Sequence, residues 1–67
     1  MIDVTLNGER RTLDDDTTVD VVVARLDRGR AGVAVAINGD VVPRSQWPAT
    51  TLRADDRVEV LAAAQGG

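Results

Sequence analysis

The fold is decided near the start of the chain by the stretch IDVTLNGERRTL, residues 2–13. Its apolar residues at positions 2, 4 and 6 alternate with polar ones, which is the period of a strand with one buried face. Asn7-Gly8 follows at once, and this dipeptide favours a two-residue type I′ turn because both central residues need a positive φ. We therefore predict a β-hairpin whose return strand runs over residues 9–13.

A single helix is predicted after this hairpin. Thr17 is placed to cap it, and Asp20 lies three residues later, where a capping box has its acidic member. Gly29 and Gly32 provide residues that can end a helix in the left-handed conformation. Four apolar residues recur at i, i+3, i+4 and i+7, the spacing of one helix face: Val19, Val22, Val23 and Leu26.

Three further strands are predicted in the second half of the chain. Val33–Ile37 is wholly apolar and β-branched at alternate positions, which indicates a strand buried on both faces or nearly so. The remaining predicted elements are a tight turn at residues 38–40, a short strand at 41–42, an irregular connection between Pro43 and Pro48 that holds Trp47, and a final strand over 58–62.

The order hairpin, helix, strand, short strand, final strand predicts an α+β domain. One helix cannot cover both faces of a sheet of four or five strands, so one face stays open for a partner. This order is typical of the β-grasp, or ubiquitin-like, fold, in which a mixed four- to five-stranded sheet carries one main helix on one face. By analogy with that fold, the first and last strands lie side by side, in parallel, at the centre of the sheet. We expect residues 1–62 to form this domain and residues 63–67 to form a flexible C-terminal tail.

The residue types that are missing exclude most catalytic roles. The 67 residues contain no Cys, His, Lys, Tyr or Phe. The usual general base near neutral pH, the usual thiol nucleophile and the Schiff-base amine are therefore absent. Thiolate and imidazole metal ligands are also missing, so no metal site is predicted, and a carrier is a better expectation than an enzyme.

Charge and hydropathy patterns exclude other classes of protein. The net charge is −3, with eleven acidic residues against eight arginines, whereas a nucleic-acid-binding module normally shows a basic patch. No apolar run is long enough to cross a bilayer, and the N-terminus lacks the pattern of a signal peptide. We expect a cytoplasmic protein that binds neither nucleic acid nor membrane.

The C-terminal segment Leu61-Ala62-Ala63-Ala64-Gln65-Gly66-Gly67 carries no side-chain charge and is built mainly of small residues. Five extended residues reach about 17 Å, which is enough to thread from a domain surface into the active site of a partner. A terminal carboxylate is ionised at neutral pH and is a poor electrophile, so its chemistry requires an external activator such as ATP. The segment therefore predicts a carboxylate handle on Gly67.

Several motifs, in order and at matching length, resemble the ThiS family of sulfur carrier proteins of thiamine biosynthesis. They are Asn7-Gly8-Glu9, the segments 33–38 and 42–47, Asp55-Asp56-Arg57-Val58-Glu59, and the ending Gln65-Gly66-Gly67. The resemblance covers essentially the whole chain.

The resemblance implies a specific sulfur chemistry at Gly67. A ThiF-type adenylyltransferase, using ATP and Mg, would adenylate the Gly67 carboxylate. Sulfur from cysteine, delivered by a cysteine desulfurase or another sulfurtransferase, would convert it to a thiocarboxylate. Thiazole synthase, ThiG, would accept that sulfur. Ala64, Gln65 and Gly66 would then thread into the partner active sites, and no cofactor would be bound by the chain itself.

Three alternatives to this function stay open. A MoaD-like carrier would serve molybdopterin or another pathway such as cysteine synthesis. A ubiquitin-like modifier would be joined to target lysines, and a stand-alone binding module would have an inert tail. Arg44, Trp47 and Leu61 are candidates for a partner interface, although packing is the favoured role of Trp47 because the core has no other aromatic side chain.

Overall fold

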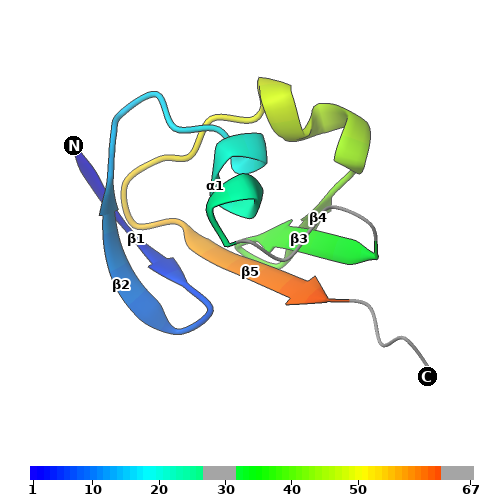
Figure 1. The fold of residues 1–67 in the computed structure, drawn as a ribbon. Helices are drawn as coiled ribbons and strands as arrows, with labels where there is room; N and C mark the ends of the chain where they lie inside the picture. Colours follow the sequence, from blue (N-terminus) through cyan, green and yellow to red (C-terminus); the bar gives the residue numbers. More distant parts are fainter. Residues whose placement is uncertain (27–31, 63–67) are drawn as a thin grey trace.

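A five-stranded mixed sheet carries two helices on one face (Figure 1). The structure is a computed structural model and describes residues 1–26 and 32–62. The strands lie in the order β2-β1-β5-β3-β4. Along the chain the elements are β1 (Ile2–Leu6), β2 (Glu9–Leu13), α1 (Val19–Arg25), β3 (Val33–Ile37), β4 (Asp40–Val42), the 3-10 helix η1 (Arg44–Ala49) and β5 (Arg57–Ala62).

The predicted hairpin is confirmed with its turn chemistry. β1 and β2 pair antiparallel from Ile2↔Leu13 to Leu6↔Glu9. Asn7 has φ 49° and Gly8 has φ 85°, the two positive values that a type I′ turn requires. The turn between β3 and β4 repeats this geometry, with φ 52° at its asparagine and 89° at its glycine.

β5 is the central strand and joins the two hairpins. It runs parallel to β1, with Thr5 opposite Arg57 and Leu6 opposite Val58. On its other side it runs antiparallel to β3 along its length, from Ile37↔Val58 to Val33↔Ala62. The predicted parallel pairing of the first and last strands is therefore confirmed, and the topology is that of the β-grasp fold.

The predicted capping box at the start of α1 is wrong. The N-cap is Thr18, one residue later than predicted, and it makes no side-chain capping bond. Backbone groups hold this helix end instead, because Val19 N donates to Thr50 O at 2.9 Å and Leu52 N donates to Thr17 O at 2.9 Å. Backbone groups of the loop that precedes β5 therefore cap the N-terminus of α1, where the sequence had predicted side-chain caps.

The C-terminus of α1 also differs from the prediction. The helix ends at Arg25, with Leu26 as a right-handed C-cap, so no glycine closes it. Gly32 does have a positive φ of 73°, but it directly precedes β3. The other predicted stop, Gly29, lies outside the described residues.

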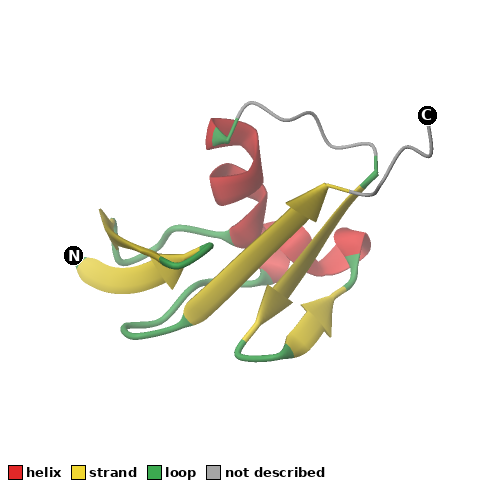
Figure 2. Ribbon diagram, turned by 90° about the horizontal axis from the view of Figure 1, so that it is seen from below, coloured by secondary structure: helices red, strands yellow, loops and turns green. Residues whose placement is uncertain are grey.

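β3 is buried on one face only, which corrects the prediction for Val33–Ile37. Val35 is 1% exposed, whereas Ala34 is exposed and Ala36 is half-buried. Viewed from below, neither α1 nor η1 lies in front of β3, β4 and β5 (Figure 2). Alanine is apolar but small, so it suits an open face as readily as a covered one, and the sequence pattern did not distinguish the two.

The connection between β4 and β5 is more regular than predicted. Residues Arg44–Ala49 form η1, whose Trp47 is 2% exposed and donates from Nε1 to Val42 O at 3.0 Å. This confirms the packing role of Trp47. The buried core of the described residues is Val4, Leu6, Val19, Val22, Val23, Val35, Trp47, Leu52, Val58 and Val60.

Candidate functional site

The candidate site is the end of β5, from which the chain continues into the C-terminal segment. Val60 is 4% exposed and points into the core, whereas the neighbouring Leu61 is 63% exposed on the open face. β5 ends at Ala62. The predicted tail, including Ala64, Gln65, Gly66 and Gly67, lies outside the described residues, so its role stays a prediction.

Two asparagine side chains hold β5 at its two ends. Asn7 Nδ2 donates to Val60 O at 3.2 Å, and Val60 N donates to Asn7 Oδ1 at 2.8 Å. Near the start of the strand, Asn38 Oδ1 accepts from Arg57 N at 2.9 Å, and Asn38 Nδ2 donates to Asp56 Oδ1 at 3.0 Å. Each asparagine is also the first central residue of a hairpin turn. Each therefore combines a turn with a long-range clamp on β5.

An apolar strip crosses the open face beside the end of β5. Leu61 is directly opposite Ala34 on β3, and Ala36 is directly opposite Val41 on β4. Val41 is 73% exposed, the highest value for a large apolar side chain of the described strands. We call these four residues the apolar strip. Leu61 was identified from the sequence, whereas Val41 was not singled out, and Ala34 and Ala36 were missed because the strand over 33–37 was predicted to be buried on both faces or nearly so.

The other two interface candidates lie elsewhere, around η1. The guanidinium carbon of Arg44 lies 5.8 Å from the centre of the Trp47 ring, close enough for a cation–π contact. Trp47 is almost fully buried and offers little surface to a partner, whereas Arg44 is exposed. The structure therefore brings Arg44 and Trp47 together, on the helix side of the sheet, and leaves Leu61 on the open face.

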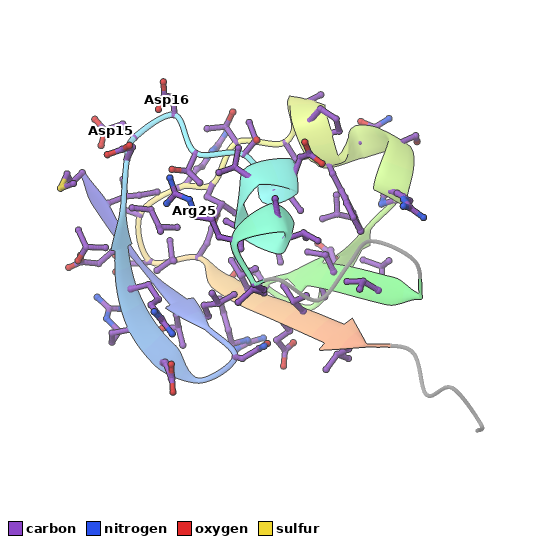
Figure 3. All side chains as sticks on the ribbon, viewed as in Figure 1. Asp15, Asp16 and Arg25 are labelled. Carbon is purple, nitrogen blue, oxygen red and sulfur yellow. The ribbon has the colours of Figure 1, made fainter. Side chains whose placement is uncertain are left out.

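The acidic loop before α1 is a solvated turn in this structure. Asp15 and Asp16 point outward from the loop that joins β2 to α1 (Figure 3). Asp15 pairs with the Met1 amine at 2.6 Å, and this hydrogen bond, reinforced by charge attraction, raises the pKa of the amine above its ordinary value of 8.0. Over residues 1–26 and 32–62, no group of three or more acidic, His or Cys side chains is arranged to hold a metal ion.

Neither helix of the described chain is both long and apolar enough to cross a membrane.

Comparison with known proteins identifies the family of the chain and agrees with its fold. The model of the ThiS family matches residues 4–67. The sulfur carrier protein ThiS of Escherichia coli K12 is 36% identical over 50 residues, which are 75% of this chain and 76% of that protein. The crystal structure of the thiamine biosynthesis protein ThiS from Geobacter metallireducens superposes with a TM-score of 0.80 at 33% identity, covering 98% of this chain and all of that one. A solution structure of a thiamine biosynthesis protein from the same organism gives 0.77, also at 33% identity, over 98% of this chain and 88% of that one. Because the family match spans nearly the whole sequence and the fold agrees, the chain belongs to the ThiS family.

Proposed function

We propose that this chain carries sulfur for thiazole formation in thiamine biosynthesis, as a thiocarboxylate on Gly67. The observation that carries the proposal is the position of β5. The central strand pairs with a neighbour on each side and leads into a short, uncharged segment of small residues that contains Gly66-Gly67. A rigid domain with such a tail can present one carboxylate to the active site of another protein. Membership of the ThiS family supports sulfur as the group that is carried.

The chemistry we propose begins with activation of the Gly67 carboxylate by ATP. A carboxylate oxygen attacks the α-phosphorus, pyrophosphate leaves, and the acyl adenylate now has a good leaving group. A persulfide sulfur attacks the acyl carbon and AMP leaves. A second thiol then cleaves the S–S bond, which releases the thiocarboxylate and leaves a disulfide behind. The thiocarboxylate is a stronger nucleophile than the carboxylate and can pass its sulfur to the thiazole precursor.

The catalytic groups for these steps belong to partner enzymes. The chain has no His, Cys or Lys to supply a base or a nucleophile, so we infer that it is a co-substrate and not an enzyme. The partners we propose are a ThiF-type adenylyltransferase that binds ATP and Mg, a cysteine desulfurase or other sulfurtransferase, and thiazole synthase. All of these act in the cytoplasm under this proposal.

The apolar strip is the surface we propose for docking these partners. It lies beside the end of β5, so a protein bound there would also receive the tail. Exposed Leu61 and Val41 give it the apolar character that the centre of a protein interface usually has. Arg44 lies on the other side of the sheet, so we propose no direct contact of Arg44 with the partner that holds Gly67.

Intact-mass measurement tests the proposal directly. The chain is incubated with its activating enzyme, ATP, a cysteine desulfurase and cysteine. The expected product has one oxygen replaced by sulfur, located on Gly67 by fragmentation. A chain extended by one bulky residue after Gly67 should stay folded and gain no sulfur. If the unmodified chain gains no sulfur from components proved active on another carrier, the proposal is wrong.

Two further measurements separate the alternatives. A protein modifier would form high-mass conjugates in cell extract that vanish when Gly67 is removed. A carrier for molybdopterin or cysteine synthesis would be consumed by those enzymes, and its thiocarboxylate would persist in the presence of thiazole synthase and its other substrates.

A further inference from the structure

The end of β5 has an asymmetric set of partners. On one side β3 pairs with it as far as Ala62. On the other side the pairing with β1 stops at Val58, because the chain turns away at Asn7-Gly8. The last backbone bond from that turn runs from Asn7 N to Val58 O at 2.9 Å. Backbone pairing from β1 therefore does not reach the residues that lead into the tail.

The side chain of Asn7 fills this gap by acting as an extra residue of β1. Its amide donates to Val60 O and accepts from Val60 N, and so satisfies the two backbone groups of Val60 that a longer, parallel β1 would pair through two different residues. The bonds are partly buried and join residues 53 positions apart. Val60 thus lies opposite Val35 of β3 on one side and is hydrogen-bonded by the Asn7 side chain on the other.

Among the described residues, Val60 is the last of β5 that is hydrogen-bonded from the β1 side, and Gly67 lies seven residues after it. If the backbone at Val60 is already ordered before docking, less conformational entropy is lost when a partner binds the segment that leads to Gly67. We propose that Asn7 is a positioning residue for the chemistry at Gly67. This inference rests on the proposed function of the tail.

Asn7 could be present only because asparagine suits the type I′ turn, so the test must separate its role in the turn from its hydrogen bonds to Val60. Glycine fits the first central position of a type I′ turn, so Asn7→Gly keeps the hairpin and removes only the amide. Asn38→Gly is the matched control, since it also deletes two side-chain hydrogen bonds from the first residue of an equivalent turn. Its bonds lie at the start of β5, away from the tail. Asn7→Asp is a second variant that keeps the size and one acceptor but loses the donor to Val60 O.

The first measurement is amide hydrogen exchange by NMR. Asn7→Gly should expose the Val60 amide, which donates to Asn7 Oδ1 in the parent, and should leave the Arg57 amide protected. Asn38→Gly should do the reverse. A Val60 amide that stays as protected in Asn7→Gly as in the parent would show that Asn7 does not hold this end of the strand, and would overturn the inference.

The second measurement is steady-state adenylation by the activating enzyme, as pyrophosphate release at varied carrier concentration. In Asn7→Gly the end of β5 around Val60 must become ordered when the carrier docks. This should raise KM by up to about tenfold, which corresponds to the loss of two ordinary hydrogen bonds. The value of kcat at saturating carrier should stay unchanged. Asn7→Asp should also raise KM, and Asn38→Gly should stay within about twofold of the parent. Equal KM values for Asn7→Gly and Asn38→Gly would refute the positioning role. Loss of activity in the parent chain would instead count against the proposed function.

Discussion

Replacement of Trp47 tests how far the small core depends on one side chain. This residue is the one aromatic side chain among 67 residues, it is 2% exposed, and its Nε1 donates to Val42 O at 3.0 Å. We consider two substitutions. Trp47→Phe keeps an aromatic ring and removes the donor, whereas Trp47→Ala removes the ring as well.

The expected losses differ enough to be told apart. Truncation of a buried tryptophan to alanine costs about 3–5 kcal/mol, since it removes apolar contacts and leaves a cavity. Trp47→Phe should cost about 1–3 kcal/mol, from the lost hydrogen bond and the smaller ring. A chain of 67 residues has a free energy of unfolding of roughly 3–10 kcal/mol at ordinary stability per residue. Trp47→Phe should therefore remain folded, and Trp47→Ala should unfold at a much lower urea concentration than either the parent or Trp47→Phe.

Urea unfolding followed by far-UV circular dichroism measures both losses. Indole fluorescence cannot serve, because each variant lacks the one indole of the chain. Arg44→Ala is the control, since it removes the exposed partner of the cation–π contact and should cost no more than about 1 kcal/mol. If the free energy of unfolding of Trp47→Ala lies within about 1 kcal/mol of the parent value, Trp47 does not hold η1 to the core, and the packing role assigned to its ring is wrong.

Three further predictions concern the turns, the two faces of β5 and the amino terminus. Gly39→Ala should lower the free energy of unfolding in urea by about 1–2 kcal/mol. The cost is backbone strain alone, because φ is +89° and nothing lies within 4 Å of an added Cβ. Gly39→Asn should cost less, since asparagine tolerates a positive φ. Val60→Ala should cost about 1–3 kcal/mol, and Leu61→Ala next to it should stay within about 0.5 kcal/mol, because their side chains lie on opposite faces; equal losses would contradict the assigned register. Asp15→Asn should lower the pKa of the Met1 amine in an NMR titration. Because the pKa of the amine is raised in the folded chain, the ion pair stabilises the fold fully at a pH below the amine pKa of the unfolded chain, near 8. This stabilisation disappears as the pH rises through the amine pKa of the folded chain. An amine pKa that Asp15→Asn leaves unchanged would contradict the ion pair.

The strands and their turns were predictable because their signals are local. Alternation over residues 2–6 and the positive φ required at Asn7-Gly8 involve neighbours in sequence, and the structure has both. The parallel pairing of β1 with β5 has no local signal, and it was predicted from the analogy with the β-grasp fold.

The errors arose where distant backbone takes over a local role. The start of α1 is fixed by the carbonyl of Thr50 in place of a side-chain cap, and nothing in the residues around Thr17 indicates that contact. The open face of β3 was missed because Ala34 and Ala36 are compatible with either face. The clamp of Asn7 on Val60 was likewise hidden, since the asparagine was already explained by its turn.

The central place of β5 has a consequence for synthesis of the chain. This strand leaves the ribosome after all the other helices and strands of residues 1–26 and 32–62, yet it is the one that joins the β1–β2 hairpin to the β3–β4 hairpin. Until residues 57–62 emerge, the two hairpins have no strand between them, and the core residues Val58 and Val60 are missing. We therefore expect the sheet to form only after β5 has been synthesised, because the two hairpins are far apart in the sequence and depend on this strand to come together.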